Sequence, residues 1–258
     1  MRHRYSLIVS SGLFLIWACD SLQPTVSLVY PSSPDAKIAH GIDKIKGSFQ
    51  ELNVRFEEVS DLGDAHGNQL LVIGDPHGEN HSNNVNELFS AAESYIIQHS
   101  DWQEKEVWLI NGSDATGTMY GLLEIADRIE RSGDEKNPLA NLEVQTVKPE
   151  VAERALSIYT MQRAYWEERF YDEDYWVKYL DNMARNRFNS LVLIFGYENG
   201  GFLAPVYPYF FDVEGFPEVR MEGHSAEEQA KNLKALNRLI SMAHERGIQF
   251  TVGIWAHI

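Results

Sequence analysis

The chain has 258 residues, with 38 acidic and 22 basic side chains and a formal charge of −16 at pH 7. Nucleic acids and anionic lipid surfaces attract basic proteins, so this balance argues against nucleic-acid binding and against general electrostatic attachment to a membrane. A single cysteine cannot form an internal disulfide bond.

The first residues have the pattern of an export signal. Arg2 and Arg4 precede an uncharged apolar run, Leu7 to Ala18, which is too short to span a bilayer. The sequence that ends at Cys19 resembles a bacterial lipobox, in which cleavage before the cysteine leaves its thiol to take a diacylglycerol. The resemblance implies a signal peptide at 1–18, a lipid on Cys19 and a tether at 19–26. The protein would then be an exported lipoprotein, anchored to a membrane at the bacterial cell envelope or surface. The alternative is an ordinary secretory signal with an incidental cysteine.

Residues 27–150 alternate short strands and helices and predict a small α+β sandwich domain. Strands are expected at 26–30, 54–59, 70–74, 107–111 and 142–147, and helices at 34–52, 86–98 and 113–131. Ser113 or Asp114 caps the last helix. Gly117 and Gly121 share one face of that helix and would allow close approach to a sheet. Phosphate binding at 111–113 is the alternative, but the glycine spacing matches no phosphate-binding fingerprint.

Residues 151–258 change in character and predict an α/β domain. Strands are expected at 154–160, 191–195 and 248–255, with helices at 171–187 and 225–245 between them. Ser225 and Glu228 have the spacing of a capping box that opens the second helix. Buried strands that alternate with helices predict a parallel sheet with right-handed crossovers.

Both halves resemble the domains of known glycoside hydrolases. The segment from Ala115 to Glu124, with its glycines and tyrosine after a buried strand, resembles the α+β domain that precedes the barrel in family 20 hexosaminidases and family 67 α-glucuronidases. The second half, with Arg154 just before its first strand, resembles the start of the (β/α)₈ TIM barrel that follows there. A closed barrel has eight strand–helix units in about 250 residues. We therefore expect three units of a truncated barrel, with the catalytic carboxylates outside this chain.

In such barrels the ligand binds at the carboxyl ends of the strands. After the first strand, Arg163 could pair with a sugar carboxylate or form a surface ion pair with Glu167 or Glu168. After the second strand, Glu198 and Asn199 are expected to face the cleft, where Glu198 could bind sugar hydroxyls.

Aromatic residues are the other candidates for contact with a sugar. Tyr207 and Tyr209 lie in a proline-containing loop, where exposed rings could stack on sugar faces or could simply cover the barrel. Trp255 and His257 follow the third strand. They could line the site, or they could be a core tryptophan and a loop histidine.

We expect no metal and no cofactor. His77 and His81 lack a third ligand, and the spacing of Asp61, Asp64 and Asn68 departs from that of calcium loops. The sequence thus predicts part of an exported lipoprotein glycoside hydrolase that acts on poly- or oligosaccharides, with uronic-acid or acetamido sugars as candidate units. This chain alone should be inactive. The alternatives are a non-catalytic carbohydrate-binding lipoprotein and an α/β lipoprotein with no role in sugar binding.

Overall fold

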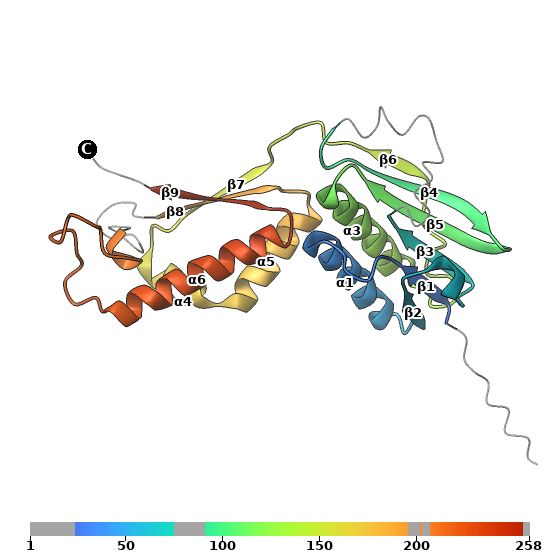
Figure 1. The fold of residues 1–258 in the computed structure, drawn as a ribbon, viewed down its shortest axis with the longest axis horizontal. Coiled ribbons are helices and arrows are strands. Elements are labelled where there is room, and N and C mark those ends of the chain that lie inside the picture. Colours follow the sequence, from blue (N-terminus) through green and yellow to red (C-terminus); the bar gives the residue numbers. More distant parts are fainter. Residues whose placement is uncertain (1–23, 75–90, 196–201, 203–206, 255–258) are drawn as a thin grey trace, which may run out of the picture.

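The computed structural model describes residues 24–74, 91–195, 202 and 207–254, which form two α/β units joined end to end (Figure 1). The first unit is built on a six-stranded sheet and the second on a three-stranded sheet. Each sheet has its own hydrophobic core. Among the helices of the described ranges, none has the length and apolar character needed to cross a lipid bilayer.

The first sheet has the strand order β2-β1-β3-β5-β4-β6. Its strands are β1 (Val26–Val29), β2 (Phe56–Val59), β3 (Gln69–Ile73), β4 (Tyr95–Trp102), β5 (Lys105–Gly112) and β6 (Gln145–Val147). Strands β2, β1, β3 and β5 are parallel, whereas β4 is antiparallel to both of its neighbours. The predicted strand at 142–147 is shortened to β6, which lies at an edge of the sheet.

Helices α1 (Ala36–Glu51) and α3 (Ala115–Ser132) pack against one face of the first sheet (Figure 1). Asp114 caps α3, because its carboxylate accepts the backbone N–H of Gly117 at 2.7 Å. A Cβ atom on Gly117 would lie 2.1 Å from the carbonyl oxygen of Ser94, and one on Gly121 would lie 2.2 Å from Cδ1 of Ile110. The close approach predicted for the two glycines is therefore confirmed.

The helix expected at 86–98 is wrong where the structure describes it, because residues 95–98 belong to strand β4. Ile96 and Ile97 pair with β5 in an antiparallel hairpin. The turn of this hairpin is formed by Gln103 and Glu104, which both have positive φ, at 49° and 64°. Neither residue favours that conformation as glycine or asparagine does, so the sequence lacks the usual signal of a two-residue hairpin.

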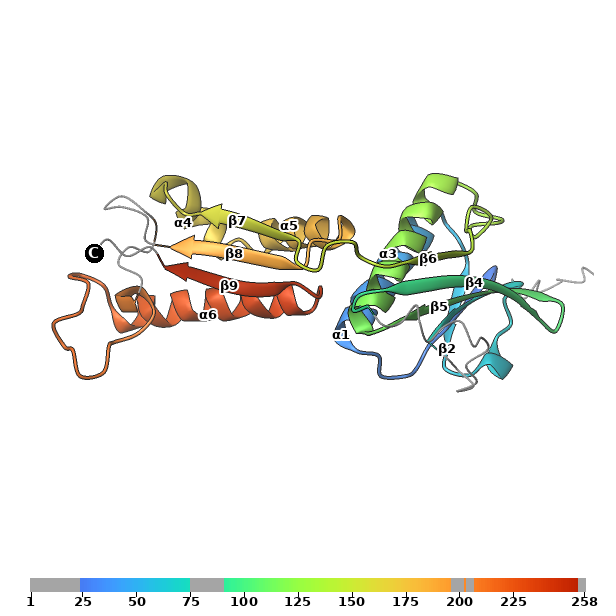
Figure 2. The same cartoon turned by 90° about the horizontal axis from the view of Figure 1, so that it is seen from above.

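The second sheet contains three parallel strands, β7 (Ala155–Tyr159), β8 (Ser190–Phe195) and β9 (Gln249–Ile254), in that order. Helices α4 (Arg163–Tyr171), α5 (Glu173–Arg185) and α6 (Ala226–His244) all lie on one face of it (Figures 1 and 2). Leu191, Leu193 and Phe195 point into the core between the sheet and these helices. The predicted parallel sheet and the capping box at Ser225 and Glu228 are confirmed.

Helix α4 is the element that the sequence did not predict in this unit. Phe170 is its only buried residue, so the helix has no apolar stripe to reveal it. The helix expected at 171–187 begins two residues later, after Asp172, whose carboxylate accepts the N–H of Tyr175 at 3.0 Å.

Several polar contacts join the units, among them ion pairs of Arg185 with Asp127 and Glu130 of α3. Two further clusters are the most connected. In the first, Asp181 of α5 accepts hydrogen bonds from Lys44 Nζ of α1 at 2.5 Å and from Arg246 Nε, just after α6, at 2.6 Å. In the second, Glu93 accepts from Arg154 and, at 2.9 Å, from Asn189 Nδ2. In the first cluster Lys44 comes from the first unit, whereas Asp181 and Arg246 both belong to the second. In the second cluster Glu93 comes from the first unit and its two donors from the second. Polar pairing between residues of different units therefore holds the units together.

His40 lies beside the first cluster and makes the stability of the protein depend on pH. Its Nε2 is 3.8 Å from Asp181 Oδ1, and the side chain is almost buried. Burial, with help from the positive charge of Arg246, lowers the pKa of His40 from 6.5 to about 4. The folded protein therefore keeps His40 neutral at pH values where the unfolded chain binds a proton.

We expect the free energy of unfolding to fall as pH drops from about 6.5 to about 4. A histidine whose pKa is lower in the folded state than in the unfolded state stabilises the folded protein at pH values above the unfolded pKa. This stabilisation, here on the order of 3 kcal/mol, is lost as the pH falls toward the folded pKa. Urea titrations at several pH values would measure this slope. His40→Phe should flatten it, whereas His66→Gln, at an exposed histidine, should not. An unchanged slope in His40→Phe would contradict the assignment.

Candidate functional site

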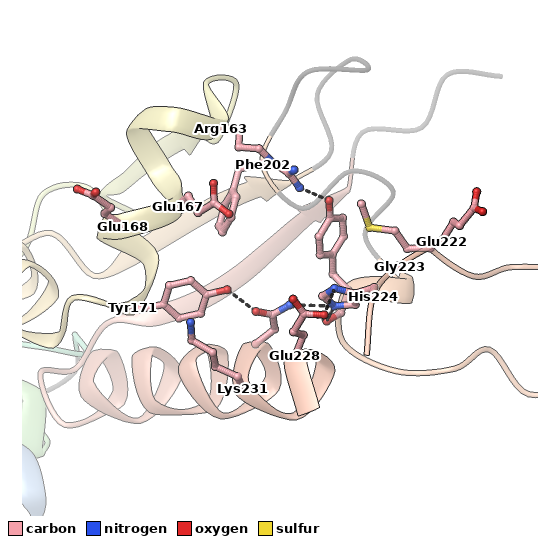
Figure 3. Close-up of a pocket in the computed structure, with 13 residues that line it drawn as sticks. Arg163, Glu167, Glu168, Tyr171, Phe202, Glu222, Gly223, His224, Glu228 and Lys231 are labelled. Carbon is pink, nitrogen blue, oxygen red and sulfur yellow. Dashed lines mark hydrogen bonds and ion pairs between the residues drawn. The ribbon is translucent and has the colours of Figure 1, made fainter. Parts of the chain in front are cut away.

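A cavity of about 580 Å³ lies where α4, the 3-10 turn at Tyr207–Tyr209 and the start of α6 meet (Figure 3). Every segment that lines it follows the carboxyl end of β7 or β8 in the chain, which is where ligands bind in parallel α/β folds. The cavity is lined by Arg163, Glu167, Glu168, Tyr171, Phe202, Tyr209, Met221, Glu222, Gly223, His224, Glu228, Lys231 and Asn232.

Tyr209 forms one wall of this cavity. Arg163 donates a hydrogen bond to the Tyr209 hydroxyl (Figure 3), and its guanidinium carbon lies 5.8 Å from the centre of the ring. His224 approaches the same ring edge-on, with 5.1 Å between the ring centres. Burial raises the pKa of Tyr209 although Arg163 opposes the shift, so the phenol is a neutral hydrogen-bonding group near neutral pH.

Asn232 of α6 holds the opposite wall in place. Its side chain is only 2 % exposed. Its Oδ1 accepts a hydrogen bond from the Tyr171 hydroxyl, and its Nδ2 donates to the carbonyl oxygen of Tyr209 at 2.9 Å (Figure 3). Lys231 Nζ lies 3.9 Å from the centre of the Tyr171 ring. One buried amide therefore connects α4, the 3-10 turn and α6, and a satisfied buried network of this kind keeps a site in shape.

The cavity is acidic overall. Four glutamates line it, against Arg163, Lys231 and His224. Glu228 accepts the backbone N–H of Ser225 at 2.8 Å, and this hydrogen bond lowers its pKa. The other three glutamates, which are Glu167, Glu168 and Glu222, have no hydrogen-bond or ion-pair partner among the described residues. Ionised carboxylates only accept hydrogen bonds, so the cavity suits a ligand with many hydroxyl donors better than an anion.

The structure brings two of the predicted site residues together, because Arg163 and Tyr209 share this cavity. Arg163 bonds to Tyr209 rather than to Glu167 or Glu168. Tyr209 was expected either as an exposed ring that stacks on a sugar or as a ring that covers the barrel. It is only 4 % exposed, so its faces are not free for stacking. Tyr207 is 47 % exposed, packs near Phe211 and does not line the cavity.

The remaining predicted residues lie outside the described part of the chain. These are Cys19, Glu198, Asn199, Trp255 and His257, together with His77 and His81. Within the described ranges, no group of three or more metal-ligating side chains occurs.

Sequence reasoning missed Tyr171, His224, Lys231 and Asn232. One signal was present for Asn232, which shares the buried stripe of α6 with Leu239, Met242 and Ala243. A polar residue in an apolar stripe must find hydrogen-bond partners in the fold.

No protein-family model matches the chain, and no curated protein matches it. Solved structures do match. One such structure is a GH138 enzyme targeting pectin rhamnogalacturonan II, which superposes with a TM-score of 0.64 at 20 % sequence identity. The match covers 90 % of this chain and 25 % of the other, so the chain spans about a quarter of that enzyme. The sequence resembled family 20 and family 67, whereas this structure belongs to family GH138. The match therefore supports a glycoside-hydrolase-like fold and favours neither family 20 nor family 67.

Proposed function

We propose that this chain is part of an exported lipoprotein glycoside hydrolase that acts on poly- or oligosaccharides. The observation that carries the proposal is the match of 90 % of the chain to a glycoside hydrolase with a TM-score of 0.64. In this proposal the first unit is the α+β domain that precedes the barrel, and strands β7, β8 and β9 with their helices are its first three strand–helix units. Cys19 carries the lipid that anchors the protein to the membrane.

The cavity beside α4 and α6 contributes contacts to the sugar rather than the catalytic pair. Hydrolysis of a glycosidic bond uses two carboxylates, or a substrate acetamido group in place of one of them. We place these groups on later strands, outside this chain. Glu167, Glu168 and Glu222 accept hydrogen bonds from sugar hydroxyls, and Arg163 donates to ring or hydroxyl oxygens. The target of the GH138 enzyme makes a pectic polysaccharide the first substrate to test.

The test is to express the complete open reading frame that contains residues 1–258 and to measure the release of reducing sugars from pectic polysaccharides. We expect hydrolysis by the complete product, and binding without hydrolysis by the 258-residue chain. Binding without hydrolysis by the complete product would favour the non-catalytic carbohydrate-binding lipoprotein. Absence of both would refute pectic polysaccharides as the substrate.

Arg163→Gln should weaken glycan binding by the 258-residue chain by roughly tenfold to a hundredfold, because a charge-assisted hydrogen bond contributes roughly 1.5–3 kcal/mol. Arg55→Gln, at an exposed arginine of the first unit, is the matched control and should leave binding unchanged. Calorimetric titration with pectic oligosaccharides measures both. Equal affinities in the two variants would remove Arg163 from the site.

A further inference from the structure

The contact between the two α/β units, which we call the joint, contains little apolar surface. The chain crosses the joint once, between β6 and β7, through residues 148–153, which are mostly exposed (Figure 1). Among the described residues, Ala184 is the only buried side chain that packs in the hydrophobic core of the other unit. Units that share little apolar surface usually move relative to one another. Separating them would leave both cores almost intact.

A cavity of about 450 Å³ lies in the joint, between α1 and α3 of the first unit and α5 of the second. Lys44 and Asp181 both line this cavity, and their charged atoms are 2.5 Å apart. The Lys44 side chain is 40 % exposed. Water therefore reaches one of the ion pairs that link the units, so the joint is not sealed by packing at this point.

His40 of α1 lies beside this ion pair, and its Nε2 has no hydrogen-bond partner among the described residues. Three charged groups face it, which are Asp181 of α5, Arg246 after α6 and Lys44 of its own helix. Burial first, and then the positive charge of Arg246, lower the pKa of His40 to about 4 while the joint is closed. In an open joint the imidazole would meet water and would bind a proton near its ordinary pKa of about 6.5.

The turn that carries Arg246 cannot adapt to a proton on His40 while the joint is closed. Arg246 Nε is 2.6 Å from Asp181 Oδ1. A Cβ atom on the next residue, Gly247, would lie 2.8 Å from Cγ2 of Thr116 at the start of α3. The backbone of the turn therefore rests on the first unit. Moving Arg246 away from His40 means lifting the turn off α3, and that movement opens the joint.

Asp181 keeps its charge over the pH range in which His40 titrates. Burial would raise the pKa of Asp181, but the hydrogen bonds from Lys44 and Arg246 outweigh burial and lower it. A proton on His40 is therefore attracted by one carboxylate and repelled by two cations, in a site that offers it little water. The imidazole is the group in this cluster that changes charge between pH 6.5 and 4.

We propose that the joint is an acid-operated hinge, in which protonation of His40 separates α1 from α5 and Arg246 while each unit stays folded. Residues 148–153 keep the two units connected. The acidic cavity is lined by residues of the second unit, so it moves with that unit as a whole. Closure should be weaker by roughly thirtyfold at about pH 5 than at about pH 7.5, because only the open joint binds the proton readily.

The distance between two spin labels, measured by dipolar electron paramagnetic resonance, tests the hinge. Glu51→Cys on α1 and Lys234→Cys on α6 place the labels at exposed positions of different units. Cys19→Ser removes the one native thiol of the 258-residue chain. We expect one narrow distance distribution at about pH 7.5 and a second, broader population at about pH 5. Circular dichroism at both pH values should show that the secondary structure is unchanged.

Variants of two histidines assign the effect. His40→Gln is neutral at both pH values and should stay closed, and His40→Phe is a second neutral replacement if glutamine disturbs the packing. His66→Gln, at a histidine that is 68 % exposed on the first unit, should open as the wild type does. A single narrow distribution in the wild type at the lower pH overturns the hinge. Opening of both His40 variants at that pH also overturns it, as does broadening that coincides with loss of circular dichroism, because the units would then be unfolding.

Discussion

Gly117→Ala should destabilise the protein by about 3 kcal/mol, although alanine is the better helix former. The new methyl group would lie 2.1 Å from the carbonyl oxygen of Ser94, which is backbone and cannot rotate away. That oxygen also accepts the N–H of Ser113 at 2.9 Å, so a shift that relieves the clash breaks a hydrogen bond at the start of α3. Urea unfolding followed by circular dichroism measures the loss.

Gly47→Ala is the matched control, because it makes the same substitution inside helix α1. A Cβ atom on Gly47 would meet nothing within 4 Å. Only the helix propensity changes there, and the variant should be more stable by roughly 0.5–1 kcal/mol. If both substitutions stabilised the protein, α3 would not pack as closely on the sheet as the structure indicates.

Asp181→Ala should cost about 3 kcal/mol or more, because it removes the shared carboxylate between the two units. Arg246 is the reason for the size of the effect. Its side chain is only 9 % exposed, and Asp181 Oδ1 lies 2.6 Å from its Nε. Without Asp181 the guanidinium would be buried without its nearest carboxylate, and Lys44 would lose a partner at 2.5 Å. Chemical denaturation of the wild type and the variant measures the difference.

Two further variants test whether the loss of stability in Asp181→Ala comes from the unpaired charge of Arg246. Asp43→Ala removes a carboxylate that is 74 % exposed on α1 and should change stability by no more than about 0.5 kcal/mol. Arg246→Met should cost less in the Asp181→Ala background than in the wild type, because the unpaired charge is then gone. Additive losses in the double variant would show that Asp181 and Arg246 do not interact.

The elements that the sequence predicted well are those with strong local signals. Leu191 to Phe195 is a continuous apolar run and forms β8, and the Ser225–Glu228 box opens α6 as expected. The sequence failed where tertiary pairing decided the conformation. Residues 95–98 have no turn signal after them, and pairing with β5 makes them a strand. Helix α4 has only Phe170 to bury, so its position depends on the neighbouring helices.

In the candidate site, too, local signals predicted some residues and tertiary packing placed the others. Placing ligand contacts after the carboxyl ends of strands led to Arg163 and Tyr209, which do share a cavity. Asn232, which donates to the carbonyl oxygen of Tyr209, comes from α6, more than twenty positions away, and no spacing rule connects it to Tyr209 or to Tyr171. The burial of Tyr209 also depends on α6, so a loop composition typical of exposed rings was misleading.

The sequence by itself determined the charge balance, the alternation of buried strands with helices, and the two glycines that bring α3 close to its sheet. These follow from local composition and periodicity, which act within one element. The tertiary structure alone decided that Asp181 joins two units and that Arg163, Tyr209 and Asn232 line one acidic cavity. Those features depend on distances between elements, which packing sets and which no single segment encodes.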